Sequence, residues 1–217
     1  MPANVFQLPV WFDLGATFAF SLTGAIVAIK RGYDIVGIFF IALATGLGGA
    51  LIRDGVFIKT PGPTPLLSDP RYLETVAAAA IVGGFFGFKV KRFHRVVAVI
   101  DALGLGAYAV FGFQKSMTAG LSIPAALLVG VINAAGGGLL RDLLTGEVPL
   151  VFKPGQFYVL IAFAGEVAFV FCTQVLDLAA TPAAMIAIAF TFVFRALTIT
   201  FNWRTAPLAG PADRSAV

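Results

Sequence analysis

The chain has 217 residues, of which 59% are hydrophobic and only 12% are charged, and its mean hydropathy is +0.94. This composition excludes an ordinary soluble domain and indicates an integral membrane protein. The net charge of +4 comes from basic residues near the ends of apolar segments, a pattern that is typical of membrane topology signals and not of nucleic-acid binding.

The apolar segments predict seven membrane-spanning helices, at about 9–29, 34–53, 72–89, 96–115, 121–143, 156–176 and 179–201. The apolar runs are continuous and do not alternate with a two-residue period, so the expected fold class is all-α and polytopic. No basic residue precedes Lys30, so we expect the first segment to be retained and not cleaved as a signal peptide. We expect one transmembrane domain over 1–203 and a flexible C-terminal tail over 204–217.

Basic residues also predict the orientation of the chain. If the N-terminus lies outside, nine basic residues fall on the inner side, namely Lys30, Arg31, Lys89, Lys91, Arg92, Arg95, Lys153, Arg204 and Arg214, and three fall outside, namely Lys59, Arg71 and Lys115. The positive-inside rule therefore favours an outer N-terminus and a cytoplasmic C-terminus. Within this set, Lys89, Lys91, Arg92 and Arg95 form a weak candidate site for anionic lipid head groups.

Two stretches that end in Arg-Asp show that the chain contains an internal repeat. Residues 45–54 read TGLGGALIRD and residues 133–142 read NAAGGGLLRD, 88 positions later. The same offset relates Asp13 to Asp101 and Gly32 to Gly120, which predicts a three-helix unit over 9–95, a second over 96–177, and a last helix over 178–203. Because each unit has an odd number of helices, the two units enter the membrane from opposite sides and form an inverted repeat.

Inverted repeats are common in proteins that move solutes, and their sites lie near the membrane midplane on interrupted helices. We therefore expect the second and fifth helices to break at the glycines and to expose carbonyl groups to ions and water. The expected ion pathway is Thr45, Gly46, Gly48, Gly49, Asn133, Gly136, Gly137 and Gly138. The alternative is that these small residues only allow two membrane helices to pack closely.

Six charged residues lie at the ends of these segments and are candidate pore-mouth charges: Asp13, Arg53, Asp54, Asp101, Arg141 and Asp142. Helix ends on the same side of the membrane predict two pairs, Arg53 with Asp13 and Arg141 with Asp101. Adjacent residues point about 100° apart on a helix, so we do not expect Arg53 and Asp54 to neutralise each other. The alternative is that these charges only anchor helix ends at the membrane surface.

Other polar residues are isolated in apolar segments. Glu166 falls near the middle of the sixth helix, where a carboxyl group is expected to be functional or paired. We expect Arg195 to extend to the inner membrane surface, and Cys172 to be a small buried hydrophobe. No paired acids, Ser/His pair or Cys/His cluster is present, so the sequence predicts neither an enzyme nor a metal site.

The residues quoted above resemble the TRIC family, the trimeric intracellular cation channels, and in particular its bacterial and archaeal members. The resemblance rests on the seven-helix plan, on the two glycine stretches and on Gly146-Glu147-Val148-Pro149 after the fifth helix. It implies a homotrimer with one pore per protomer, lined by glycine-kinked second and fifth helices. Animal members carry Lys-Glu-Val where this chain has Gly146-Glu147-Val148, so regulation through that lysine is not implied here.

The resemblance also implies that the chain is a passive channel for monovalent cations, chiefly K⁺, with K⁺ or Na⁺ as the permeant ion and no cofactor. A bacterial-type member implies the plasma or inner membrane, with membrane lipids and further copies of the chain as partners. The alternative is a secondary transporter of a small solute such as an amino acid, because the inverted repeat fits that class equally well.

Overall fold

The computed structural model describes residues 8–59, 63–64, 68–89, 93–153, 157–201 and 203, and within them all regular structure is helical. The long helices are α1 (Trp11–Lys30), α2 (Ile35–Ile52), α4 (Pro70–Phe86), α5 (Phe93–Thr118), α6 (Ile123–Leu144), α7 (Tyr158–Gln174) and α8 (Ala180–Thr200). The π-helix η1 (Arg53–Ile58) extends α2, and the short 3₁₀ helix η2 (Gly87–Lys89) extends α4. The all-α prediction is confirmed, and the expected tail at 204–217 lies outside the described residues.

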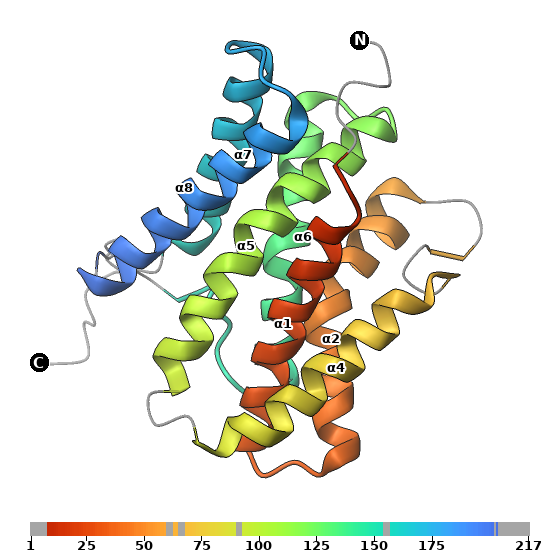
Figure 1. The fold of residues 1–217 in the computed structure, drawn as a ribbon, viewed down its shortest axis with the longest axis vertical. Coiled ribbons are helices and arrows are strands. Elements are labelled where there is room, and N and C mark those ends of the chain that lie inside the picture. The colour runs from red at the N-terminus through yellow and green to blue at the C-terminus, as the bar shows by residue number, and fades with distance from the viewer. Residues whose placement is uncertain are drawn as a thin grey trace, which may run out of the picture.

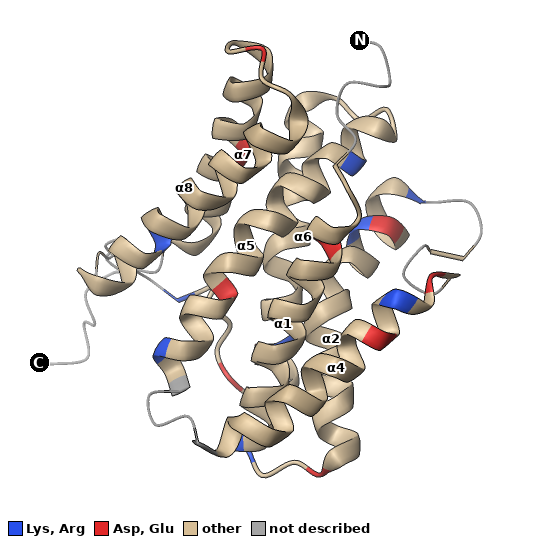
Figure 2. Ribbon diagram, in the orientation of Figure 1, with Lys and Arg blue, Asp and Glu red and all other residues tan. Residues whose placement is uncertain are grey.

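Five helical segments are long and apolar enough to cross a membrane, and α7 is a shorter apolar helix. Most of the helical ribbon carries no charge (Figure 2). Large apolar side chains such as Phe40, Phe85 and Phe190 point outward and are exposed. An apolar surface of this extent is the surface that lipid covers in a membrane protein.

The two halves of the chain have the same arrangement of helices, and corresponding helices run in opposite directions. In Figure 1, α1 runs downward and its counterpart α5 runs upward, and α2 and α6 are likewise opposed. Helix α1 packs on α2 and α4, α5 packs on α6 and α7, and the halves meet where α1 contacts α5 and α2 contacts α6. Helix α8 packs on α5 and α7. The predicted inverted repeat with an added last helix is therefore present.

The turns after α1 and α5 show that the repeat extends to single hydrogen bonds. Gly32 and Gly120 both have positive φ angles, of 77° and 87°, which glycine adopts without a steric penalty. The N–H of Tyr33 donates to the carbonyl of Ala28, and the N–H of Leu121 donates to the carbonyl of Ser116. All of these residues are related by the offset of 88, so both helices end in the same glycine turn.

Helix α4 begins with a charged cap. The side chain of Asp69 accepts a hydrogen bond from the N–H of Arg71, and Pro70 occupies the first turn. Both Asp69 and Arg71 lie at the exposed end of this helix. The hydrogen-bonded Arg71 guanidinium holds the pKa of the Asp69 carboxyl below its usual value.

The glycine runs lie inside continuous helices. Helix α2 is α-helical from Ile35 to Ile52, and α6 is α-helical from Ile123 to Leu144. The expected interruption within the glycines is therefore absent, and α2 leaves the α-helical pattern only afterwards, at η1. Tight contact between α2 and α6, described below, accounts for glycine in these runs without a break.

Candidate functional site at the crossing of α2 and α6

Helices α2 and α6 cross at their glycine runs with their backbones in contact. A Cβ atom on Gly49 would overlap the carbonyl oxygen of Asn133, and a Cβ atom on Gly137 would overlap the carbonyl oxygen of Thr45. Gly137 is the counterpart of Gly49 in the repeat, and Asn133 is the counterpart of Thr45, so the two contacts are equivalent. The pseudo-two-fold axis that relates the two repeats therefore passes through the crossing. The glycines thus have the packing role that small residues have between membrane helices.

Arg53 is fully buried next to this crossing. Its Nε donates to Oδ1 of Asp54 at 2.7 Å and its Nη2 donates to Oδ2 at 3.0 Å, while Nη1 donates to Oδ1 of Asn133 at 3.2 Å. No ion pair within 4 Å joins Arg53 to Asp13, so the predicted direct contact is not formed, although the two charges are close enough to attract each other. The expectation that Arg53 and Asp54 do not neutralise each other is wrong. The long side chain of arginine reaches the neighbouring carboxylate even though the two Cβ atoms diverge, and it binds both oxygens.

Asp13 binds a tyrosine instead. The hydroxyl of Tyr72 in α4 donates to Oδ2 of Asp13 at 2.6 Å, and Oδ1 of Asp13 has no hydrogen-bond partner among the described residues. Nζ of Lys115 in α5 donates to Oδ2 of Asp54 at 2.9 Å. Among the described residues, the charged groups that meet at this end of the crossing are Arg53 and Lys115 with Asp13 and Asp54, and their formal charges cancel.

Arg141 occupies the symmetry-related position at the other end of the crossing and is 2% exposed. Its Nη1 donates to Oδ1 of Asp101 at 3.1 Å and to Oγ1 of Thr23 at 3.0 Å. Its Nε donates to Oδ1 of Asp142 at 2.9 Å. The predicted pair of Arg141 with Asp101 is confirmed, and the adjacent Asp142 adds a second carboxylate that the helical-angle argument did not anticipate.

These partners remove the main electrostatic objection to a cation pathway here. An uncompensated arginine about 8 Å from a cation would repel it by about 2 kcal/mol at an effective dielectric constant of about 20. Both Arg53 and Arg141 are held within hydrogen-bond distance of carboxylates, so neither presents an isolated positive charge.

Tyr108 is a central residue that the sequence did not single out. It is fully buried in α5, its hydroxyl shares a 2.7 Å hydrogen bond with Oγ1 of Thr17, and it also donates to the carbonyl of Gly46. Its own carbonyl accepts from Nδ2 of Asn133 at 2.7 Å. Tyr108 thereby links its own helix α5 to α1, α2 and α6. Its counterpart in the first repeat is Phe20, so a comparison of the two repeats does not reveal a shared polar residue at this position.

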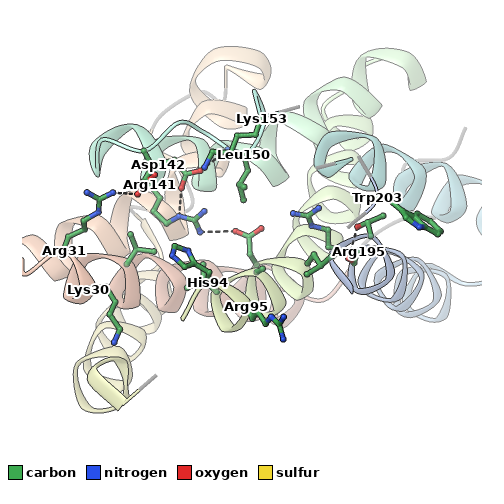
Figure 3. Close-up of a pocket in the computed structure, with 17 residues that line it drawn as sticks. Lys30, Arg31, His94, Arg95, Arg141, Asp142, Leu150, Lys153, Arg195 and Trp203 are labelled. Atoms are coloured by element: carbon green, nitrogen blue, oxygen red, sulfur yellow. Dashed lines mark hydrogen bonds and ion pairs between the residues drawn. The ribbon is translucent and has the colours of Figure 1, made fainter. Parts of the chain in front are cut away.

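A cavity of about 540 Å³ lies at the Arg141 end of the molecule (Figure 3). Its charged and titratable lining residues are Lys30, Arg31, His94, Arg95, Asp101, Arg141, Asp142, Glu147, Lys153 and Arg195. Arg31, from the turn after α1, forms an ion pair with Glu147, which follows α6. None of the predicted pathway residues Thr45, Gly46, Gly48, Gly49, Asn133, Gly136, Gly137 and Gly138 lines this cavity.

Arg195 is buried and lines this cavity, so its guanidinium points toward the same end of the molecule as Arg141. The residue is 2% exposed, and its guanidinium carbon lies 5.1 Å from the ring centroid of Tyr158. A cation over an aromatic face is stabilised by the ring, which offsets part of the cost of burial. Of the basic run, Arg95 lines the cavity, Lys91 and Arg92 lie outside the described residues, and the side chain of Lys89 is not described.

Glu166 is buried in the middle of α7, and neither of its carboxyl oxygens has a hydrogen-bond partner among the described residues. Cys172 is also buried in α7, as expected. Among the described residues, no group of three or more His, Cys, Asp and Glu side chains is placed to hold a metal ion.

The fold and the site indicate a general class of membrane protein. An inverted repeat of three-helix units, with buried charges on both sides of the crossing between its halves, is the architecture of membrane proteins that move solutes. A family model described as "Glycine transporter" matches residues 10–90 and 98–174, which cover both repeats.

Relatives and solved structures agree with this match. The chain is 33% identical to a UPF0126 membrane protein of Deinococcus radiodurans over 71% of this chain and 72% of the relative, and 25% identical to the inner membrane protein YadS of Escherichia coli over 90% and 94%. It is similar, with a TM-score of 0.82 and 30% identity, to the TRIC trimeric intracellular cation channel orthologue from Rhodobacter sphaeroides, over 88% of this chain and 97% of that one. A structure reported as the basis for conductance through TRIC cation channels gives a TM-score of 0.78 and 30% identity over 95% of this chain. The chain belongs to the TRIC family.

Proposed function

We propose that this chain is a passive channel for monovalent cations, chiefly K⁺, and that it acts as a homotrimer with one pore in each protomer. The observation that carries the proposal is the likeness, at 30% identity and a TM-score of 0.82 over 88% of the chain, to a structure described as a trimeric cation channel. No cofactor is needed for this function, because the permeant K⁺ or Na⁺ moves down its own gradient.

The proposed pathway runs along the α2–α6 crossing within one protomer. It includes the stretch from Thr45 to Gly49, the stretch from Asn133 to Gly138, and the charged groups at the two ends. Buried hydroxyls and carbonyls beside the crossing, such as the Tyr108 hydroxyl and the Gly46 carbonyl, are oxygen ligands of the kind that replace water around K⁺. The neutralised arginines allow a cation to pass the two ends without the repulsion of a bare charge.

We further propose that the Arg141 end faces the cytoplasm in the plasma or inner membrane. Lys30, Arg31, Arg95 and Lys153 gather at this end, and the positive-inside rule places such residues in the cytoplasm. Arg95 at this cavity and the neighbouring basic run are proposed to contact anionic lipid head groups weakly. Tagging each terminus and testing its access to a membrane-impermeant reagent checks the orientation.

Secondary transport of a small amino acid is the second candidate function. One observation favours it, namely the family model that matches both repeats and is described as "Glycine transporter". The likeness to solved structures described as cation channels favours the channel instead.

A flux experiment tests the proposed function. Purified protein in liposomes loaded with KCl is expected to release K⁺ into a K⁺-free buffer of an impermeant organic cation when a protonophore lets H⁺ enter in exchange and balance the charge. The initial rate is expected to rise with the gradient and to be unaffected by glycine. Protein-free liposomes and liposomes that contain an unrelated membrane protein are the controls. Glycine uptake that saturates and depends on an ion gradient, with no K⁺ release, would refute the channel.

A further inference from the structure

The carboxyl group of Glu166 is buried inside the membrane-spanning part of this structure and has no role in the proposed pathway. Glu166 is 0% exposed and lies eight residues from each end of α7, which runs from Tyr158 to Gln174. Eight residues of α-helix span about 12 Å, so the group sits near the middle of the span. Both of its oxygens lack a hydrogen-bond partner among the described residues. A buried carboxylate without partners is strongly disfavoured in such a place.

The surroundings of Glu166 are shaped to hold this side chain. A Cβ atom on Gly130 of α6 would overlap Oε1 of Glu166, so the oxygen occupies space that only glycine leaves open. Under the offset of 88 the counterpart of Gly130 is Ala42, and under the alignment of Tyr158 with Tyr72 the counterpart of Glu166 is Ala80. Where the first repeat has two alanines, the second repeat therefore has a glutamate and a glycine that leaves room for its carboxyl group.

Backbone groups of α5 also lie beside Gly130. A Cβ atom built on Gly130 would overlap Oε1 of Glu166, and it would lie 2.8 Å from the carbonyl oxygen of Ala109 and 2.9 Å from the backbone nitrogen of Phe113, the last two in α5. A carboxylate buried here has no cation or hydrogen-bond donor among the described residues to offset the loss of water, whereas a neutral carboxylic acid carries no charge and can donate its proton to a nearby carbonyl. Only the protonated form of Glu166 suits this position.

The titratable groups of the helices packed against α7 have other contacts. On α5, Tyr108 bonds to Thr17 and Gly46, Lys115 pairs with Asp54, and Asp101 pairs with Arg141. On α6, Asp142 pairs with Arg141, and on α8, Arg195 lies over the ring of Tyr158. His94 and Arg95 line the cavity at the Arg141 end. No ion pair joins any described basic group to Glu166.

We propose that Glu166 is a proton-binding site, at which a neutral carboxylic acid fastens α7 to α5 and α6. Ionisation releases the proton to water and leaves a carboxylate that must be hydrated, which separates α7 from the Ala109 region. Ala109 directly follows Tyr108, whose carbonyl holds Asn133, which in turn holds Arg53. Loss of the proton therefore loosens the hydrogen bonds that fix Arg53 at its end of the crossing, and conduction increases as the pH rises.

The state of the proton is tested without any flux measurement. Infrared spectra of the purified wild-type protein at neutral pH are expected to contain the carbonyl band of a neutral carboxylic acid that is absent from Glu166→Gln, a variant that keeps the size of the side chain and a hydrogen-bond donor. Glu74→Gln, at an exposed position in α4, is the matched control and leaves the band in place. Identical bands in wild type and Glu166→Gln overturn the proposal.

Thermal stability gives a second readout that is also independent of transport. At pH values between the titration of an unfolded glutamate and that of Glu166 in the folded protein, the folded state binds one more proton at this group than the unfolded chain does, so the contribution of Glu166 to stability falls as the pH rises. The slope against pH is expected to be smaller in Glu166→Gln and unchanged in Glu74→Gln. Equal slopes in all three proteins contradict the proposed proton site.

The effect on conduction rests on the proposed channel function and is measured last. K⁺ release by the wild type is expected to rise about fivefold or more from mildly acidic to alkaline buffer, the low end of typical coupling between two sites, and to stay flat in Glu166→Gln. If the wild type releases no K⁺, the channel proposal fails while the infrared result still decides the proton site. If it does release K⁺ and Glu166→Gln keeps the full pH dependence, the regulatory role is wrong.

Discussion

At the scale of single residues, buried charges in this protein are held in groups and not in isolated pairs. Arg141 binds Asp101, Asp142 and Thr23 at once, so its removal leaves two buried carboxylates without their cation. Exposed pairs such as Arg31 with Glu147 are in contact with water and are worth much less.

Substitution of Arg141 tests this difference. Arg141→Gln is expected to lower the free energy of unfolding by about 3–5 kcal/mol, the cost of leaving buried ion-pair partners uncompensated. Arg31→Gln, the control, is expected to cost about 0–1 kcal/mol because its pair is exposed. Unfolding in detergent by heat or denaturant measures both values, and equal losses in the two variants would mean that Arg141 is not held in the way described.

The hydroxyl of Tyr72 permits a second test at this scale. Tyr72→Phe removes the hydrogen bond to Asp13, whose other oxygen already lacks a partner, and is expected to cost about 1–3 kcal/mol of stability. Tyr33→Phe, in the exposed turn after α1, is the matched control and is expected to have little effect. If Tyr72→Phe behaves as Tyr33→Phe does, Asp13 has another partner.

Sequence reasoning reached part of this network. The position of Asp101 and Arg141 on helix ends at the same side of the membrane was enough to predict their pair. Each arginine binds the aspartate that follows it, so the halves agree in that contact. They differ at Nη1, which donates to Asn133 from Arg53 but to Asp101 from Arg141, and for this reason the direct contact predicted for Asp13 is not formed. Helical angles locate Cβ atoms and not the end of a long side chain, so they could not exclude the bond between Arg53 and Asp54.

At the scale of helices, the glycine runs bring α2 and α6 into backbone contact. Glycine is favoured both where a helix is interrupted and where two helices pack closely, so the sequence alone could not distinguish these two explanations. The structure separates them because Gly49 and Gly137 each lie against a carbonyl of the opposite helix while both helices continue. The repeat made this contact a symmetric one, which a single glycine run could not have indicated.

Alanine at these glycines tests the crossing. Gly49→Ala and Gly137→Ala each place a methyl group on a backbone carbonyl that cannot move away cheaply, and each is expected to cost about 1–3 kcal/mol of stability and to reduce K⁺ flux. Gly84→Ala in α4 is the control, because nothing lies within 4 Å of the added Cβ, and alanine is expected to be neutral or to stabilise the helix by up to about 1 kcal/mol. Thermal unfolding of the three variants decides, and a tolerated Gly49→Ala contradicts the backbone contact.

At the scale of the whole molecule, the inverted repeat and the seven helices were predictable because apolar length and a constant offset are properties of the sequence. The differences between the halves were not predictable in that way. The link through Tyr108 and the buried carboxyl of Glu166 both arise where the repeats differ in sequence, since their counterparts are Phe20 and Ala80. A symmetric scaffold with asymmetric polar groups is what distinguishes the two ends of the proposed pathway.

The most direct test of the central claim is the current carried by purified protein in a planar bilayer under a K⁺ gradient. We expect discrete unitary currents that reverse close to the K⁺ equilibrium potential and that persist without glycine. The absence of unitary currents in active preparations that instead take up glycine in a saturable, ion-coupled manner would contradict the account and establish the protein as a transporter.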